Sequence, residues 1–240
     1  MNELVLGRFP ILSYAGQEAI NALCTNLSFS GEQVKRIMIT SAYAGEGKSF
    51  LAMNLMRTLA RNGKRVALVD ADLRRSSLSS DYMISFPGDG SMPGLAHLLA
   101  GMAKEDDVIY RTGLRCAWMI PAGRAVSNPL PLLNSRRFGA LMEQLAERMD
   151  YVLVDSPPVG MVIDAAEIAK SCDGILLVVR HNAVRRHALI HAKEQLEQTG
   201  CPILGTVLNM AKPERCSPYD SYYCESKHRE KGHSPRPGRK

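Results

Sequence analysis

Residues 37–49 read Ile37-Met38-Ile39-Thr40-Ser41-Ala42-Tyr43-Ala44-Gly45-Glu46-Gly47-Lys48-Ser49. The first four are apolar enough for a buried strand, and the segment from Ala42 to Ser49 has the spacing of a phosphate-binding loop. Leucines recur every four positions behind it, at Leu51, Leu55 and Leu59, which predicts a helix. Strand, loop and helix together bring backbone N–H groups and a helix N-terminus to one point, which suits an anion. The alternative is a loop that needs its glycines only to turn.

The loop supplies most of the residues expected to bind a nucleotide. These are Ala44, Gly45, Glu46, Gly47, Lys48, Ser49 and Phe50. Within this set, Lys48 can reach terminal phosphates and the Ser49 hydroxyl can ligate Mg²⁺.

Predicted strands and helices alternate along the chain. Strands are expected at 34–41, 65–70, 116–121, 151–155, 174–180 and 203–209, and helices at 16–28, 48–62, 95–100, 135–149, 164–171 and 183–199. The alternation predicts an α/β fold of the P-loop NTPase type, a doubly wound, mostly parallel sheet with helices on both faces. We expect an N-terminal helical segment (1–33), a nucleotide-binding kinase domain (34–211) and a disordered, basic C-terminal tail (212–240).

Composition narrows the class of protein. The chain has 240 residues, 45% of them hydrophobic, and no apolar run approaches the roughly 18 residues that span a bilayer. Its N-terminus lacks the basic start and long apolar stretch of a signal peptide, so we expect a cytoplasmic protein. Six scattered cysteines form no C-x-x-C pair, which argues against a zinc site or a redox motif.

The last residues differ from the rest in charge and polarity. Residues 212–240 hold eight Lys or Arg and four Asp or Glu, a net charge of +4. A basic tail could contact an acidic membrane surface, nucleic acid or an acidic partner, but a solvated, disordered tail is the favoured interpretation. Three of the chain's eight tyrosines, Tyr219, Tyr222 and Tyr223, lie in this segment.

Aspartates follow two of the predicted strands. Asp70 and Asp155 each end an apolar strand, and Asp72 comes two positions after Asp70. In such sheets ligands bind at the carboxyl ends of the strands, and a buried carboxylate there requires a cation or a hydrogen-bond donor. Asp155, with Ser49, best suits Mg²⁺, and Asp72 suits a further place around the metal. Asp70 is the candidate base that accepts a hydroxyl proton.

Two of the acidic residues have a simpler explanation as caps. Asp72 could cap the turn into Ser76-Ser77. Asp164, followed three positions later by Glu167, has the pattern of a capping box at the start of a helix.

Several motifs in order resemble those of bacterial tyrosine autokinases, the P-loop kinases that regulate capsule and exopolysaccharide synthesis. Residues 41–49 match their Walker A motif, 66–74 their second acidic motif (A′) and 152–158 their Walker B motif. Further matching positions are 121–123, 128–129, 132–133, 135, 164–165 and 205–209. The resemblance runs from about Glu18 to Asn209 and covers most of the chain.

This resemblance implies an enzyme that binds ATP and Mg²⁺ and phosphorylates tyrosines in its own C-terminal tail. Tyr219, Tyr222 and Tyr223 are then the phosphoacceptors, and Asn209 matches a position near the nucleotide base. Short members of the family are cytosolic and are switched on by a separate membrane protein of the chain-length-determining type. The expected location is therefore the cytoplasm, at the inner face of the membrane through that activator, and no nucleic-acid partner is expected.

The chain departs from the family pattern in the helix that joins subunits into a ring. That helix carries a glutamate and two arginines at three-residue intervals, whereas this chain has Glu18, Asn21 and Cys24. Self-association remains expected, but Asn and Cys cannot replace the bidentate pairing of arginine in a ring contact.

Two other functions remain open. The septum-site and chromosome-partitioning ATPases are structural relatives, but they carry an additional lysine where this chain has Tyr43. The last alternative is a regulatory subunit that binds ATP without catalysis, against which the intact Lys48 and the three aspartates argue.

Overall fold

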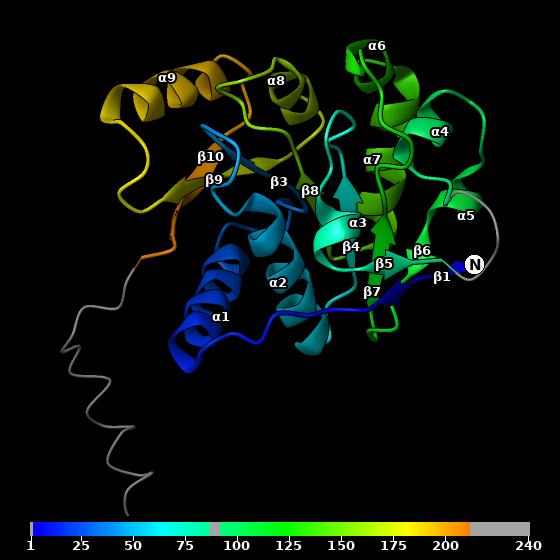
Figure 1. The fold of residues 1–240 in the computed structure, drawn as a ribbon, viewed down its shortest axis with the longest axis horizontal. Helices are drawn as coiled ribbons and strands as arrows, with labels where there is room; N and C mark the ends of the chain where they lie inside the picture. Colours follow the sequence, from blue (N-terminus) through cyan, green and yellow to red (C-terminus); the bar gives the residue numbers. More distant parts are fainter. Residues whose placement is uncertain (1, 87–91, 212–240) are drawn as a thin grey trace, which may run out of the picture. The chain divides into compact units, whose positions relative to one another are not determined.

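An eight-stranded sheet forms the centre of the computed structural model, which describes residues 2–86 and 92–211 (Figure 1). Its order is β1-β6-β7-β4-β8-β3-β9-β10, and its neighbours run parallel except β6 against β7. The strands are β1 (Asn2–Glu3), β3 (Arg36–Ser41), β4 (Val66–Asp70), β6 (Tyr110–Arg111), β7 (Ala117–Ile120), β8 (Tyr151–Asp155), β9 (Gly174–Arg180) and β10 (Ile203–Asn209). A separate antiparallel pair joins β2 (Val5–Leu6) to β5 (Ile84–Ser85).

Helices cover both faces of the sheet. They are α1 (Tyr14–Ser28), α2 (Lys48–Arg61), α3 (Leu78–Asp81), α4 (Leu95–Leu99), α5 (Glu105–Val108), α6 (Leu130–Leu133), α7 (Arg136–Arg148), α8 (Asp164–Ala169) and α9 (Arg186–Glu197). One buried apolar cluster packs α1 and α2 against the sheet, and a second packs α4, α7, α8 and α9. The doubly wound, mostly parallel fold expected from the alternation is therefore confirmed.

The predicted bounds agree best with the observed ones where the sequence pattern is strongest. The structure places β8, β9 and β10 at the predicted residues, and β8 and β9 are near-continuous apolar runs. Helix α1 begins two residues before the expected Gly16, since the Ser13 hydroxyl caps it by accepting a hydrogen bond from Gly16 N at 3.2 Å.

Some short elements differ from the expectation. Between the predicted strands at 65–70 and 116–121 only the helix at 95–100 was expected, yet the structure also has α3, β5, α5 and β6 there. Helix α6 lies between the predicted strand at 116–121 and the predicted helix at 135–149. The N-terminal segment carries β1 and β2 before its helix. Elements of two to four residues are too short to show a period, and their strands form through pairing with distant residues.

The contacts between residues define a boundary in the chain at the end of β10. The residues up to Asn209 form one compact unit. The functional division expected from the sequence, into 1–33, 34–211 and 212–240, stays a prediction.

Across residues 2–86 and 92–211, no helix has the length and apolarity needed to cross a bilayer.

Cys24, Cys116, Cys172 and Cys201 are free thiols. The remaining two cysteines lie outside the described residues.

Candidate functional site

The phosphate-binding loop sits between β3 and α2, as its sequence predicts. Gly45 and Gly47 have φ of +77° and +92°, in the left-handed region that a side chain would strain. Leu51 N bonds to Gly47 O at 2.9 Å and starts the first turn of α2. The Val159 N–H donates to Ser41 O at 2.9 Å, so the segment after β8 supports the loop from one side.

Glu46 has a structural role that could not be predicted from the sequence: it forms hydrogen bonds that hold the phosphate-binding loop in place. Its buried carboxylate accepts hydrogen bonds from Tyr43 N at 2.8 Å and from Arg180 N at 3.2 Å. The Asn209 side-chain amide donates to Glu46 O at 2.9 Å. These bonds connect the ends of β9 and β10 to the phosphate-binding loop and place Asn209 beside it. A contact between Asn209 and a base stays a prediction.

Asp70 and Asp155 lie next to each other at the carboxyl ends of β4 and β8. They are direct partners in the parallel ladder, and they are 1% and 2% exposed. Burial, then the charge of Asp155, raises the pKa of Asp70 well above its usual range, although a hydrogen bond from the Ser76 hydroxyl opposes the shift. The sheet therefore brings together two carboxylates that disfavour each other's ionisation.

The Walker A residues face Asp155. Burial raises the pKa of Asp155 to about 6, while a hydrogen bond from Ser49 and the nearby charge of Lys48 pull it down. Lys48 and Ser49 open α2, so a single helix start carries the cation and the hydroxyl to this carboxylate.

An observation about unpaired atoms favours a cation here. The Oδ1 atoms of Asp70 and Asp155 are buried and have no hydrogen-bond partner among the described residues. A buried carboxylate oxygen without a partner is costly, and a divalent cation would satisfy it. Within residues 2–86 and 92–211, no group of three or more His, Cys, Asp or Glu side chains is placed to hold a metal ion.

Asp72 combines the two explanations offered for it. It is half-exposed, and its Oδ1 accepts a hydrogen bond from Arg75 N at 3.0 Å, so it caps the turn after β4. Its charge also raises the pKa of both Asp70 and Asp155, which places it close to them. A place near a metal stays a prediction, because the cap alone explains the residue equally well.

The interpretation of Asp164 as a helix cap was wrong. Helix α8 has Ile163 at its N-cap position without a side-chain cap, and Asp164 is buried. Its two carboxylate oxygens accept hydrogen bonds from Arg74 Nε at 2.5 Å and from the other side of the guanidinium at 3.0 Å. Arg74 also donates to Ser127 O at 2.9 Å. The A′ segment is thus held to α8 by a pair 90 positions apart, for which the sequence carries no local signal.

The remaining predicted residues lie apart from this cluster. Tyr219, Tyr222 and Tyr223 fall outside the described residues. On α1, the Asn21 amide donates to Glu18 Oε1 at 3.0 Å, and Cys24 is buried against the core, where burial raises its pKa to about 11. Cys24 therefore faces inward rather than presenting a contact to another chain.

Comparison with known proteins agrees with this geometry. Residues 37–222 match the family model described as the CobQ/CobB/MinD/ParA nucleotide binding domain. The tyrosine-protein kinase CpsD of Streptococcus agalactiae is 38% identical over 206 residues, which cover 86% of this chain and 88% of that protein.

Solved structures separate two groups of relatives. The kinase domain of the Escherichia coli tyrosine kinase ETK has a TM-score of 0.75 at 31% identity, covering 84% of this chain and 80% of that one. The septum site-determining protein MinD of Pyrococcus horikoshii OT3, complexed with Mg-ADP, has a TM-score of 0.61 at 26% identity, covering 78% and 75%. The chain has a P-loop and two paired aspartates at strand ends, it has a kinase relative of nearly equal length, and its structure is more like a kinase domain than like MinD. This chain therefore belongs to the bacterial tyrosine-protein kinase family.

Proposed function

We propose that this kinase transfers the terminal phosphoryl group of ATP, with Mg²⁺, to tyrosines of its own C-terminal segment. The observation that carries the proposal is the pair of unsatisfied oxygens on Asp70 and Asp155, beside Ser49 and Lys48. Mg²⁺, when bound, supplies charge neutralisation at the transferring phosphoryl group. Ser49 and Asp155 would hold the metal, with Asp72 in a supporting position.

The protein's own residues have three further roles in the proposed reaction. The loop residues 44–50 cradle the phosphates, and Lys48 neutralises charge on the transferred group. Asp70 orients the incoming tyrosine and accepts its proton. Its Oδ1 has no hydrogen-bond partner among the described residues and can accept one from a tyrosine hydroxyl.

The acceptors and the wider role are proposed from the sequence. Tyr219, Tyr222 and Tyr223 cluster in a polar, proline-flanked segment. We propose that their phosphorylation regulates capsular or exopolysaccharide synthesis, together with a membrane-embedded activator of the chain-length-determinant type. The chain would then work in the cytoplasm at the inner face of the membrane.

The experiment incubates the purified full chain with Mg-ATP, alone and with the cytosolic segment of a candidate activator, and detects phosphotyrosine. Phosphotyrosine is expected in the full chain and absent from Lys48→Met, whose thermal unfolding should match the wild type. A chain ending at Ser217 should bind Mg-ATP in calorimetry and show no modification. Undiminished modification of the shortened chain would refute the tail acceptors.

A nucleotide-dependent positioning ATPase gains no support from the site. The position of its additional lysine is Tyr43, which is 43% exposed and joins the loop through its backbone. Steady ATP hydrolysis without phosphotyrosine, under every condition, would nevertheless replace the kinase proposal with that function.

A further inference from the structure

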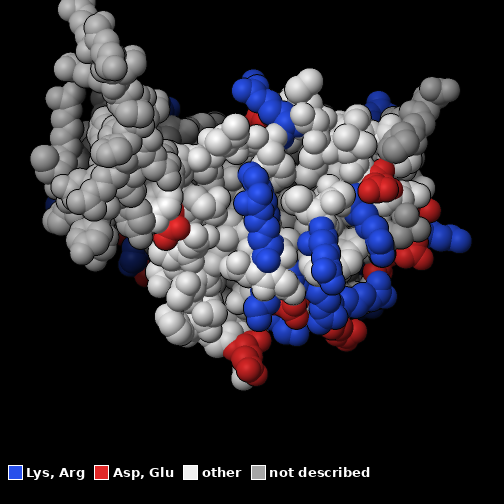
Figure 2. Space-filling view, turned by 90° about the horizontal axis from the view of Figure 1, so that it is seen from below, with Lys and Arg blue, Asp and Glu red and all other residues white. Residues whose placement is uncertain are grey.

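The protein carries a cluster of cations at the end of the sheet opposite the phosphate-binding loop. We call it the basic face; it consists of Arg8, Arg57, Arg61, Lys64, Arg65 and Arg115. Arg57 and Arg61 lie one turn apart at the end of α2, and Lys64 and Arg65 follow before β4. Figure 2, the view from below, shows Lys and Arg side chains gathered on this face, with some Asp and Glu side chains among them.

Backbone contacts hold the parts of the basic face together. Val66 N, next to Arg65, donates to Cys116 O at 2.9 Å and so brings Arg115 beside the start of β4. The guanidinium of Arg57 lies over the ring of Phe9 at 4.7 Å, and Phe9 neighbours Arg8.

Most of this charge has no ion-pair partner in the part of the chain that the structure describes. Among the described residues, Arg65 alone of the six forms an ion pair, with Asp150 at 3.2 Å. Burial and the like charge of Arg61 lower the pKa of Arg57, so this guanidinium is both half-buried and repelled. An anion arriving at the face would relieve that repulsion.

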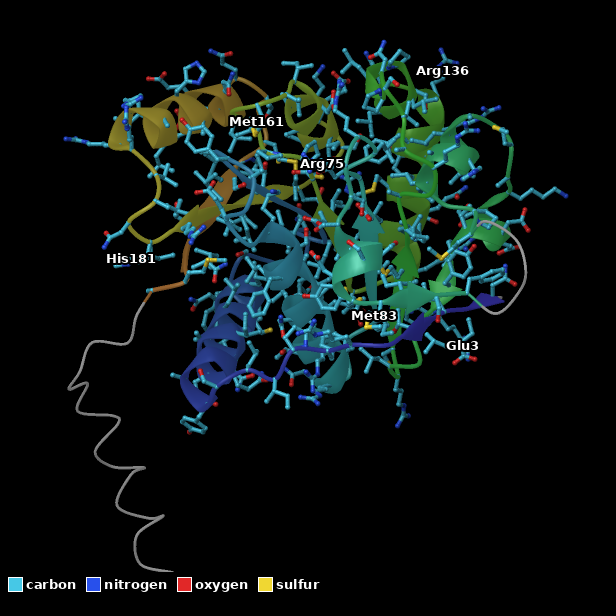
Figure 3. The ribbon with its side chains drawn as sticks, in the orientation of Figure 1. Glu3, Arg75, Met83, Arg136, Met161 and His181 are labelled. Atoms are coloured by element: carbon cyan, nitrogen blue, oxygen red, sulfur yellow. The ribbon has the colours of Figure 1, made fainter. Side chains whose placement is uncertain are left out.

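Apolar side chains project from the same region. We call residues 4–12 the N-terminal strap; in Figure 1 they cross the molecule below β5. Four apolar side chains of the strap pack against the buried apolar cluster: Leu4, Leu6, Phe9 and Leu12. Their outward neighbours Val5 and Ile11 are 53% and 98% exposed. Met83, labelled in Figure 3 close to the strap, is 62% exposed, and its carbonyl accepts a hydrogen bond from Gly7 N at 3.3 Å.

We propose that the basic face and the N-terminal strap dock on the surface of an anionic lipid bilayer. Arginine and lysine side chains attract lipid phosphates, and exposed aliphatic side chains beside them can enter the headgroup region. An acidic protein would need the cations alone. The nearly fully exposed Ile11, three residues after Arg8, fits a surface that has both charge and an apolar interior. The inference is independent of the proposed reaction.

The position of the face is compatible with catalysis on a membrane. The basic residues precede β4 and β7 or end α2, whereas the loop and the strand-end aspartates lie at the carboxyl ends of the strands. Docking therefore leaves the nucleotide site directed away from the lipid.

The test is co-sedimentation of the full chain with vesicles of phosphatidylcholine alone or mixed with phosphatidylglycerol. The test variant carries Arg8→Gln, Arg61→Gln, Lys64→Gln and Arg115→Gln. A matched control removes four exposed arginines that follow the carboxyl ends of β7 and β9, at the opposite end of the sheet: Arg124→Gln, Arg136→Gln, Arg185→Gln and Arg186→Gln. Thermal unfolding of both checks that they fold.

Binding is expected only to the anionic vesicles and should weaken as salt is raised, because screening shortens the reach of surface charge. The test variant should bind about tenfold more weakly or worse, and the control about as well as the wild type. Equal binding by both variants, or no binding by the wild type, would overturn the proposal. Retained binding by the test variant would assign any affinity to another surface, such as the basic C-terminal residues.

A second readout tests the apolar part. In an Ile11→Trp variant, tryptophan emission should shift to shorter wavelength on adding anionic vesicles and stay unchanged with phosphatidylcholine. Emission unchanged by bound anionic vesicles would contradict insertion of the strap. An acidic polypeptide that shifts the emission equally would indicate a protein partner instead of lipid and would also overturn the proposal.

Discussion

Asp155 makes the stability of the nucleotide-free protein depend on pH. Its pKa is about 6 in the folded chain and 3.8 as the reference, so the folded state holds the proton more tightly. Stability should therefore fall as pH rises from about 4 to about 6, and the full penalty, on the order of 3 kcal/mol, remains above that range. Asp155→Asn should be more stable than the wild type at pH 7, with the difference closing near pH 4.

Urea unfolding of both proteins across this range, without Mg²⁺ or nucleotide, measures the effect. A difference that does not change with pH would show that Asp155 does not titrate as its burial implies. The variant should also bind Mg-ATP more weakly, since the same carboxylate that destabilises the empty protein is the proposed metal ligand.

A glycine after β8 controls the distance between two backbones at the phosphate-binding loop. A Cβ at Gly160 would stand 2.5 Å from Ala42 O, which is main chain and cannot move alone. Gly160→Ala should therefore displace the loop, weaken Mg-ATP binding in calorimetry and lower the melting temperature. Unchanged affinity would show that the loop tolerates the displacement.

Gly139 is the matched control for this substitution. It lies within α7, and nothing stands within 4 Å of an added Cβ. Gly139→Ala should leave nucleotide affinity unchanged and stabilise the fold by about 0.5–1 kcal/mol, because alanine gives up less backbone freedom in a helix.

The Arg74–Asp164 pair joins the A′ segment to α8 and should be strongly coupled. The Asp164 side chain is 1% exposed and that of Arg74 is 35% exposed. Removing the arginine therefore leaves a buried carboxylate without its ion-pair partner. Arg74→Leu should cost about 2–4 kcal/mol in urea unfolding, less than for a fully buried pair because water reaches the guanidinium. The double variant Arg74→Leu with Asp164→Leu should lose far less than the sum of the two single losses. Additive losses would refute the coupling.

The sequence predicted the strands and helices of the central sheet and the strand ends that carry the site. It could do so because long apolar runs and the glycine spacing of a phosphate-binding loop are local signals. Asp70, Asp155 and Ser49 could be placed together for that reason alone. The Arg74–Asp164 pair and the tie from Glu46 to Arg180 could not, because each joins residues that only the folded sheet brings together. Strands of two residues such as β1 and β5 fail for the same reason: their pairing partners, not their own sequence, define them.

At the scale of the whole molecule, the order of the strands sets the distance that the acceptor tyrosines must cover. The last strand, β10, ends at Asn209, and Asp70 ends β4, four strands away across β9, β3 and β8. At about 4.8 Å per strand the two ends are about 19 Å apart. Tyr219 follows Asn209 by ten residues, which extend to about 33 Å. The tail is thus long enough to reach the site of its own chain.

We therefore expect each chain to phosphorylate its own tail, since Asn21 and Cys24 also lack the arginines of a ring contact and Cys24 faces the core. The initial rate of phosphotyrosine formation per mole of protein should not change with protein concentration. A full-length Lys48→Met chain mixed with an active chain ending at Ser217 supplies the control, because only transfer between chains can then label the tail. It should remain nearly unlabelled. Efficient labelling in the mixture, or a rate per mole that rises with concentration, would show that the kinase acts on a neighbouring copy.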